Sequence, residues 1–405
     1  MRNQLPLENI KVIDLSSFAA VSSTGRLLAD WGADVIKVES LRGDAWRQFA
    51  CVGNVPATED ENPCWEINNS NKRDIALNLR DPDGMEVLHR LLKDADVFIT
   101  NYRMKALKGM KLTYEDLAPQ YPRLVWGHLS GYGEEGPDAK RPGFDVATYW
   151  ARTGLMLDAG EPTAAPLSQL YGFGDISTGT VLAGGICAAL CKQMRTGQGS
   201  KVQISLMGNA IWSAGLVIMA AQDAYKDIWP KPRTMPPSPL TCSYQCKDGE
   251  WIIFCILEYN RYYPDFCNTI GRPDLITDER YNSLEHVKEH NTEFVHLLDR
   301  IFATKTRDEW CELFDKTDIV YDKIVHFKDV SKDEQARQCQ YIFEQTFKNG
   351  RKVVMPNTPI VFNETRNKVK EAPSLGKDSQ AILQSLGYSE EDVKAFIEKG
   401  VVKVQ

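Results

Sequence analysis

The side chain best placed to do chemistry in this chain is Asp175, in the run Gly172-Phe-Gly-Asp-Ile-Ser-Thr-Gly179. Apolar residues recur at helical spacing from Val181 to Leu190, so Asp175 is expected at the N-cap or in the first turn of a buried helix. The dipole at a helix start favours an ionised carboxylate by about 0.3–1 kcal/mol. The glycines on either side of Phe173 leave room for another molecule to reach it. Asp175 is therefore either an ordinary N-cap or a nucleophile.

Length, composition and net charge limit the number of domains, the partners and the location of the protein. The chain has 405 residues, of which 43% are hydrophobic and 25% charged, which predicts two domains with substantial cores. Its net charge of -7 argues against nucleic acid or an anionic membrane as the main partner. The first residues lack a basic region followed by an apolar run, and the weakly polar run 206–221 is too short to span a membrane. We therefore expect a cytoplasmic protein.

Short apolar strands alternate with helices along the first half of the chain, a pattern typical of a mostly parallel sheet covered on both faces. The expected strands are 11–15, 34–38, 75–79, 97–100, 124–129 and 201–206, and the expected helices are 24–31, 83–92, the one that follows Asp175, and 208–225. The fold class is α/β, with a Rossmann-like large domain.

A proline-rich segment, 230–239, ends this pattern and is expected to be a linker. The turn Lys247-Asp-Gly249 and the charged helical stretch 282–315 predict a smaller α+β domain, and Asn349-Gly350 predicts another hairpin. Ser389-Glu-Glu-Asp392 is a capping box that opens a last helix. The expected parts are a large domain over 1–225, a linker and small domain over 226–329, and a C-terminal return over 330–405 that packs on the large domain.

Two kinds of cofactor site are disfavoured by the sequence. Gly131-Tyr-Gly-Glu-Glu-Gly136 matches a dinucleotide-binding motif, but Pro137 follows where a helix should begin, and the two glutamates would repel a pyrophosphate. We expect it to be a loop. The cysteine pairs 187/191 and 242/246 and the histidines 286 and 290 lack further ligands at zinc-site spacing. We expect free thiols, no metal and no permanently bound cofactor.

Several motifs in this order resemble the family III CoA-transferases and span nearly the whole chain. They are Val35-Ile-Lys-Val-Glu39, Asn71-Lys-Arg73, Thr100-Asn-Tyr102, Gly172-Phe-Gly-Asp175 and Ala372-Pro-Ser-Leu-Gly376. Within the family, Asp44-Ala-Trp-Arg47, Asn101-Tyr-Arg103 and Pro142-Gly-Phe-Asp145 look most similar to the 2-hydroxyisocaproate and phenyllactate CoA-transferases of amino-acid-fermenting anaerobes.

The resemblance implies a covalent mechanism at Asp175. In the family this Asp attacks the carbonyl of an acyl-CoA, and an acyl-aspartyl anhydride and then an aspartyl-CoA thioester follow. Backbone amides near Gly174 would stabilise the oxyanions. By position, Asp145 matches an acidic residue beside the nucleophile. The residues that would line the CoA are Phe18, Ala19, Ser40, Arg80, Asn101, Tyr102 and Arg103; each also has an ordinary structural interpretation.

The resemblance also implies substrates and an assembly, and it leaves two alternative functions to consider. CoA thioesters and carboxylic acids would be the substrates, and the family's subunits interlink as a homodimer. Phe18, Ala19 and Phe144 suggest a large, apolar acyl group such as a hydrophobic 2-hydroxy acid. An acyl-CoA α-racemase on the same fold needs two bases, and Phe144 stands where the racemases have a histidine. A non-catalytic protein that only binds acyl-CoA is the third hypothesis.

Overall fold

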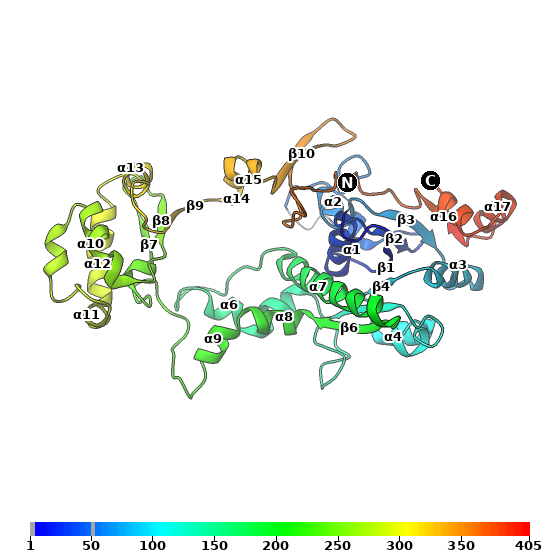
Figure 1. Ribbon diagram of the computed structural model, residues 1–405, viewed down its shortest axis with the longest axis horizontal. Coiled ribbons are helices and arrows are strands. Elements are labelled where there is room, and N and C mark those ends of the chain that lie inside the picture. Colours follow the sequence, from blue (N-terminus) through cyan, green and yellow to red (C-terminus); the bar gives the residue numbers. More distant parts are fainter. Residues whose placement is uncertain (1–4, 50–52) are drawn as a thin grey trace. The chain divides into compact units, whose positions relative to one another are not determined.

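The computed structural model describes residues 5–49 and 53–405 (Figure 1). The chain forms two compact units. The larger unit holds the described residues up to 153, 168–218 and 336–405, and the smaller unit holds 154–167 and 219–335. The sequence predicts domain bounds at 1–225, 226–329 and 330–405, and these bounds stay a prediction.

A seven-stranded sheet organises the larger unit, in the order β12-β3-β2-β1-β4-β5-β6. Its strands are β1 Lys11–Leu15, β2 Asp34–Glu39, β3 Arg73–Leu77, β4 Val97–Thr100, β5 Val125–Ser130, β6 Ser200–Ser205 and β12 Val402–Lys403. Every neighbouring pair is parallel except β12 and β3. The α/β fold class is confirmed, and the six predicted strands are present within two residues of their expected bounds.

The strand order reverses direction at β1, which lies between β2 and β4. The chain leaves β1 towards β2 and β3 on one side, and returns to β4, β5 and β6 on the other. Loops that follow β1 and β4 therefore diverge and open a crevice at the carboxyl edge of the sheet. In open α/β sheets this is where ligands bind.

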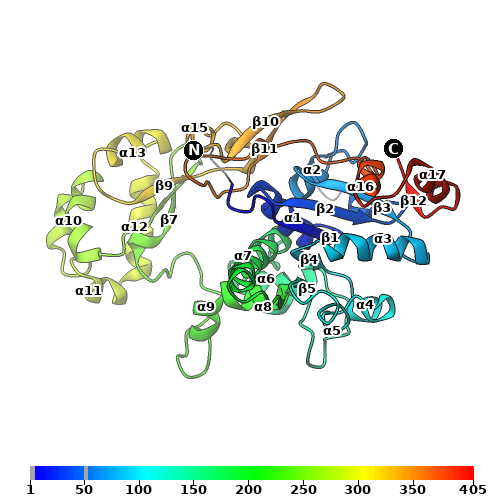
Figure 2. The same cartoon turned by 45° about the vertical axis from the view of Figure 1, so that its right-hand side comes forward.

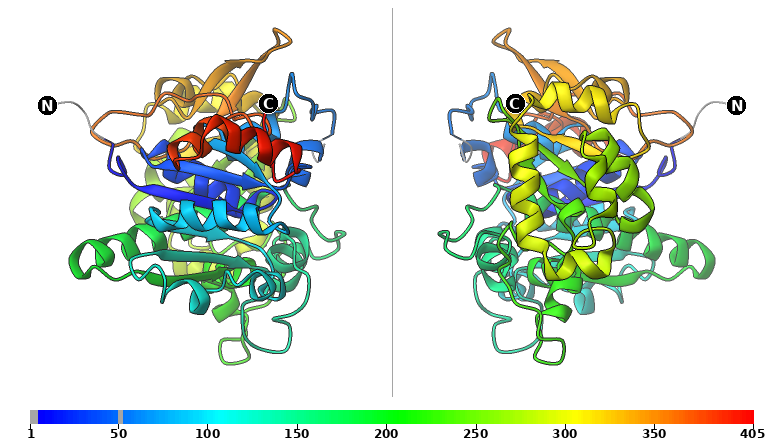
Figure 3. Two further views of the ribbon diagram at one scale, coloured as in Figure 1. Left: turned by 90° about the vertical axis from the view of Figure 1, so that its right-hand side faces the viewer. Right: turned by 90° about the vertical axis from the view of Figure 1, so that its left-hand side faces the viewer.

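Helices cover both faces of this sheet. On one face α1, Ala20–Asp30, packs against α7, Phe173–Thr196. On the other face an apolar core joins the sheet to α3 Pro82–Lys93, α4 Met104–Met110, α5 Tyr114–Leu117, α16 Ser379–Ser385 and α17 Glu390–Glu398. In Figures 2 and 3 the last two helices, in red, lie beside β3 and α3, so the end of the chain belongs to this layer.

Local sequence explains how these helices begin and end. α3 has Asp81 as its N-cap and Pro82 at its first position, and it buries Leu88 and Leu92 on one face. α17 begins at the capping box that we predicted from Ser389 and Asp392. The side-chain oxygens of both N-caps accept backbone N–H bonds that would otherwise have no partner.

One of the two long apolar segments differs from expectation. The helix expected over 208–225 is two short helices, α8 Leu206–Ser213 and α9 Gly215–Ala220. The break falls at Ala214, beside a glycine that favours helix poorly. α7 is long and apolar enough to cross a membrane by composition alone. It packs against α1, β5 and β6, as a core helix does.

The smaller unit has an antiparallel sheet with the order β7-β8-β9 and a core rich in aromatic side chains. Its elements are α6 Leu155–Asp158, β7 Ser243–Gln245, β8 Trp251–Phe254, α10 Tyr259–Thr269, α11 Leu284–Glu289, α12 Asn291–Phe302, α13 Arg307–Phe314, β9 Tyr321–Ile324 and α14 Phe327–Val330. The hairpin predicted at Lys247–Gly249 is confirmed between β7 and β8. The second predicted hairpin joins β10 Ile342–Thr346 to β11 Lys352–Pro356 in the larger unit.

Candidate active site

A cavity of about 700 Å³ lies at the carboxyl edge of the sheet, within the larger unit. Its walls come from the loops after β1, β4 and β5 and from the start of α7. Ser17 and Phe18 follow β1, Asn101 to Arg103 follow β4, and Asp175 comes from α7. The reversal of strand order therefore brings together residues that are up to 158 positions apart, counted from Ser17 to Asp175.

Asp175 is the third residue of α7, and its carboxyl reaches the cavity wall. The N-cap is Gly172, which has φ of +69° and no side chain to bind the first amides. The interpretation of Asp175 as an ordinary N-cap is therefore wrong, and its place in the first turn is confirmed. The helix dipole still acts on it from this position.

Asp145 supplies the missing cap from outside the helix. Its Oδ2 accepts the Gly174 N–H at 3.1 Å, and Asp145 itself is buried. A Cβ on Gly174 would lie 2.2 Å from Asp145 Oδ1 and 2.4 Å from Tyr149. We expected Gly174 to open the approach to Asp175 and to offer its amide to an oxyanion. The structure corrects both points, because this glycine makes room for Asp145 and Tyr149 and its amide is already bound.

The two carboxyls hold their protons unusually tightly. Burial, aided by the charge of Asp145, raises the pKa of Asp175 to about 7. Burial also raises the pKa of Asp145 to about 6, against the opposing effect of the amides of Gly174 and Asp175. Within residues 5–49 and 53–405, neither carboxyl forms an ion pair. A partly buried acid without a cation, at a cavity wall, is typical of a reactive site rather than a structural one.

The other residues expected at the site divide into two groups. Phe18, Asn101, Tyr102 and Arg103 line the cavity with Asp175. Three do not line it. Ala19 is buried against Trp46 and Trp65, and Ser40 and Arg80 follow β2 and β3, on the far side of β1. A role for these three in binding CoA stays a prediction.

Three lysines that line the cavity were not predicted from the sequence, although Arg103 beside them was. We define the basic rim as Arg103, Lys105, Lys108 and Lys140, which line the cavity and are exposed or partly so. None of the four forms an ion pair in the part of the chain that the structure describes. The i, i+3 spacing of the first two lysines, just after a strand, is the signal that could have identified them. The basic rim suits a polyanionic ligand.

The loop 131–136 is confirmed as a loop, and it forms part of the cavity wall. Glu134 ties it down, because its carboxylate binds His128 Nδ1 at 2.6 Å and Lys201 Nζ at 2.9 Å. His128 also lines the cavity, and its Nε2 lies 3.0 Å from the Tyr102 carbonyl oxygen. Both ring nitrogens of His128 are therefore engaged.

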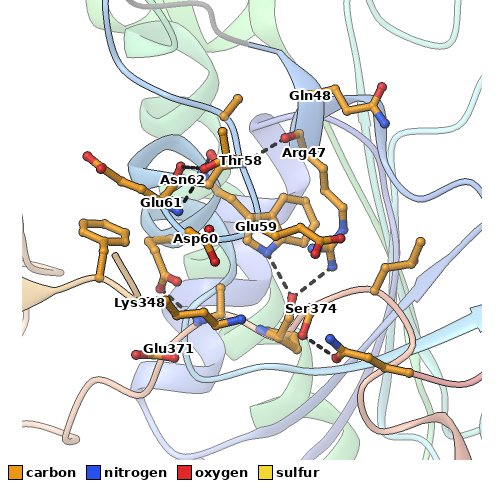
Figure 4. Close-up of a pocket in the computed structure, with 18 of the residues that line it drawn as sticks. Arg47, Gln48, Thr58, Glu59, Asp60, Glu61, Asn62, Lys348, Glu371 and Ser374 are labelled. Atoms are coloured by element: carbon orange, nitrogen blue, oxygen red, sulfur yellow. Dashed lines mark hydrogen bonds between the residues drawn. The ribbon is translucent and has the colours of Figure 1, made fainter. Parts of the chain in front are cut away.

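A second cavity, of about 420 Å³, lies in the same unit and is shown in Figure 4. Both acidic and basic side chains line it, among them Glu61, which Arg351 binds at 3.2 Å. Asn62 donates to the Arg47 carbonyl at 2.8 Å across one wall.

Comparisons with known proteins agree with the geometry. The model of CoA-transferase family III matches residues 7–379. The chain is 39% identical over 398 residues to (R)-2-hydroxy-4-methylpentanoate CoA-transferase of Clostridioides difficile, covering 98% of this chain and 99% of the relative. It is 37% identical over 390 residues to cinnamoyl-CoA:phenyllactate CoA-transferase of Clostridium sporogenes, covering 95% and 94%. A solved CAIB/BAIF family protein from Brucella suis superposes with a TM-score of 0.80 at 26% identity, covering 95% of this chain and 100% of that one.

Proposed function

This chain belongs to CoA-transferase family III and is a CoA-transferase enzyme, and from that premise we propose that Asp175 carries CoA from an acyl-CoA to a hydrophobic 2-hydroxy acid. The observation that carries the proposal is the unpaired carboxyl of Asp175 at the wall of a large cavity. The names of the two relatives at 39% and 37% identity support the substrate class.

The first half of the reaction moves CoA onto the enzyme. The ionised Asp175 attacks the thioester carbonyl, so that a C–O bond forms, the C–S bond breaks and CoA leaves as a thiolate. The product is an acyl-aspartyl anhydride. The thiolate then attacks the aspartyl carbonyl and expels the donor acid as a carboxylate. An aspartyl-CoA thioester remains, and no proton has been gained or lost.

The second half runs these steps in reverse with a different acid. The acceptor carboxylate attacks the aspartyl thioester and expels the CoA thiolate, which then attacks the acceptor's acyl carbon. The new acyl-CoA leaves, and the Asp175 carboxylate is restored. Covalent steps of this kind replace a direct and slow exchange between an acid and a thioester.

The aromatic part of the cavity supports a hydrophobic acid. The rings of Phe18 and Phe144 lie 5.6 Å apart in an edge-to-face arrangement, and Phe18 also contacts Phe49 and Trp46. Each methylene buried there would contribute about 0.8 kcal/mol, and an aromatic ring in the substrate could add edge-to-face contacts. A small diacid would gain none of this.

The basic rim supports CoA as the carrier. Coenzyme A bears phosphates, and ammonium and guanidinium groups without internal partners are suited to bind them. Lys105 and Lys108 lie on α4, whose first turn adjoins the loop that carries Asn101 and Tyr102. We propose that the phosphates bind there while the thioester reaches Asp175.

The racemase alternative is disfavoured by the aromatic residue at 144. A racemase must remove and return an α-proton, and Phe144 has no basic atom. His128 lines the cavity, but its two nitrogens are bound by Glu134 and the Tyr102 carbonyl. Incubation with a 2-substituted acyl-CoA in heavy water should give no enzyme-dependent deuterium at the α-carbon. Rapid incorporation with loss of optical purity would favour the racemase.

We also propose a cytoplasmic homodimer acting in amino-acid fermentation. Trp212 on α8 and Leu216 on α9 are 84% and 81% exposed. Apolar surface of this kind is suited to a second copy of the chain. Sedimentation at micromolar concentration should give a dimer that persists on dilution. A folded monomer under those conditions would contradict the assembly while leaving the chemistry intact.

The function is tested most simply by mass analysis of CoA esters. The purified enzyme is incubated with cinnamoyl-CoA or a saturated branched acyl-CoA and a panel of acids. We expect transfer to 2-hydroxyisocaproate or phenyllactate with higher kcat/KM than to formate, oxalate, succinate or carnitine. If no acid gains CoA, the protein only binds acyl-CoA; if oxalate or carnitine is preferred, the substrate class is wrong.

A further inference from the structure

The turn at Ser17 and Phe18, which follows β1, is held in an unfavourable backbone conformation. Phe18 has φ of +61°, in the left-handed region that non-glycine residues rarely adopt. Both residues line the cavity with Asp175. Such strain persists only where surrounding groups fix it, and it is common at functional sites.

Asp44 fixes this turn from behind. Its Oδ1 accepts the Ser17 hydroxyl at 2.9 Å and the Phe18 N–H at 3.1 Å, and its Oδ2 lies 3.2 Å from the same N–H. The same carboxylate accepts the Trp46 N–H at 3.0 Å as N-cap of the short helix Ala45–Gln48. Asp44 is 7% exposed and does not line the cavity, so any effect on the reaction passes through the turn.

Asn101 holds the same turn from the other side of the crevice. Its side chain accepts the Ser17 N–H at 3.0 Å and donates to the Ser17 carbonyl at 2.7 Å. The turn is therefore clamped between the loop after β2, through Asp44, and the loop after β4, through Asn101. These bonds cross the point where the strand order reverses.

Buried charges keep Asp44 itself in place. Lys37 Nζ lies 3.2 Å from Asp44 Oδ2, and neither side chain is more than 1% exposed. The Asp44 N–H is donated to Glu39, which Arg47 binds through its Nη2 at 2.6 Å. Arg47 in turn stacks on Trp65 at 3.8 Å and donates to the Pro373 carbonyl at 3.0 Å, beside the cavity of Figure 4. The C-terminal segment thus braces the group that holds the turn.

We propose that Asp44 is a positioning residue for CoA transfer, which sets the Ser17–Phe18 turn opposite Asp175 without touching substrate. The inference rests on the proposed function of Asp175 in this cavity. Reacting groups tolerate little displacement, since a shift of about 1 Å can cost about a hundredfold in rate. The basic rim does not contact Asp44, so the binding of CoA through its phosphates should be spared.

The test compares Asp44→Asn, Asp44→Ala and Ser17→Ala in the full-length enzyme, with kcat, KM and melting temperature measured for each. Asn keeps an oxygen that can accept the Ser17 and Phe18 bonds, and Ala keeps none. We expect kcat to fall about tenfold for Asn and about a hundredfold for Ala, with KM for acyl-CoA within about threefold of the wild-type value. Ser17→Ala should lower kcat several-fold. This variant tests the proposal if Asp44→Ala does not fold.

The matched control is Asp30→Asn, which changes an acid of the same burial on the same unit. Asp30 is 7% exposed and binds Arg26 at 2.8 Å at the far end of α1, about 15 Å along the helix from the turn. It should lower the melting temperature but leave kcat unchanged at 25 °C. A wild-type kcat in the Asp44 variants and Ser17→Ala, or an equal loss in Asp30→Asn, would overturn the positioning role.

An Asp175→Ala sample in the same series separates the two proposals. If it is inactive while the Asp44 variants turn over normally, the positioning role alone is wrong. If it turns over normally, the nucleophile is wrong, and the inference about Asp44 falls with it.

Discussion

Two groups of carboxylates in the larger unit differ in the presence of cations. Beneath the Ser17–Phe18 turn, Asp14 pairs with Lys72 at 2.8 Å and Asp44 with Lys37 at 3.2 Å. At the start of α7, Asp145 and Asp175 have no such partner among the described residues, and Asp175 lines the cavity. We call these the paired group and the unpaired group.

The presence or absence of a cation shifts the carboxyl pKa in opposite directions. In the paired group, burial alone would raise the pKa of Asp14, but Lys72 and Lys37 outweigh it and hold the pKa below its usual range. In the unpaired group, burial raises the pKa of Asp175 to about 7. In the paired group each carboxylate has a lysine beside it. Asp175 has no such partner in the described part of the chain, so its ionised form is less stable and more reactive as a nucleophile.

The largest expected effect is on kcat, when Asp175 of the unpaired group is replaced. Asp175→Ala removes the atom that would form the covalent intermediates, so kcat should fall by a factor on the order of 10³ or more. Binding of acyl-CoA should persist, because the basic rim is intact. Steady-state turnover and equilibrium binding measure both, and near-normal turnover would exclude Asp175 as the nucleophile.

Breaking the paired group should instead affect stability. Lys37→Met leaves Asp44 and Asp14 buried with one cation fewer, a change that typically costs about 3–5 kcal/mol of unfolding free energy. Lys352→Met is the control, because its ion pair with Glu344 is exposed and exposed pairs contribute little to stability. Denaturant unfolding of both variants compares them. Equal losses would show that burial does not distinguish the two pairs.

Removing the charge from the unpaired group should stabilise the protein. Asp175 has an ordinary pKa of 3.8 when unfolded and about 7 when folded. The folded state therefore binds the proton more tightly, and stability falls as pH rises from about 4 to about 7. Asp175→Asn abolishes this loss, so at pH 8 it should be more stable than the wild type, by at most about 4 kcal/mol.

Thermal unfolding of Asp175→Asn and the wild type at pH 8 and pH 5 measures this difference. The advantage of the variant should shrink towards acid pH, where the wild-type carboxyl is protonated in the folded state. A variant that melts below the wild type at pH 8 would indicate that Asp175 has a stabilising partner.

The pH dependence of the rate should report the same group. Asp175 attacks only as a carboxylate, so kcat/KM should rise with pH and level off above about 7, as the pKa of Asp175 predicts. Well below that pKa the rate should fall about tenfold per pH unit. A profile that stays flat down to pH 5 would mean that the reactive carboxyl has an ordinary pKa.

The smallest expected effect concerns the basic rim. Lys108→Gln removes one cation that lacks an internal partner, so KM for acyl-CoA should rise several-fold while kcat is unchanged. The effect should diminish at high salt, because exposed charges are screened. An unchanged KM at low salt would place the CoA phosphates elsewhere.

Much of the fold could be predicted because short apolar strands and periodic helices are local signals. The strands at Lys11–Leu15 and Val97–Thr100 have the predicted bounds, and the place of Asp175 in a first turn follows from the apolar residues after it. The paired group could not be predicted in this way. Lys37 alternates with apolar residues along β2 as an exposed charge would, and only the neighbouring strand and loop show that it is buried.

The contacts of the site also depend on long-range geometry. Asp145 caps α7 across 29 positions, and Asp44 reaches Phe18 across 26. Ser40 and Arg80 were expected to line the CoA from the family resemblance; they follow β2 and β3, do not line the cavity between β1 and β4, and their role in binding CoA stays a prediction. Pairing order, rather than strand position in the sequence, decides which loops meet.

The covalent intermediate at Asp175 is the central claim, and trapping it is the most direct test. The enzyme is mixed with acyl-CoA alone, treated with hydroxylamine, digested and analysed by mass spectrometry, with Asp175→Asn as the blank. We expect a hydroxamate on the peptide that contains Asp175, formed only when acyl-CoA is present. An active enzyme that yields no modified Asp175, or that carries the modification on another carboxyl, would contradict it.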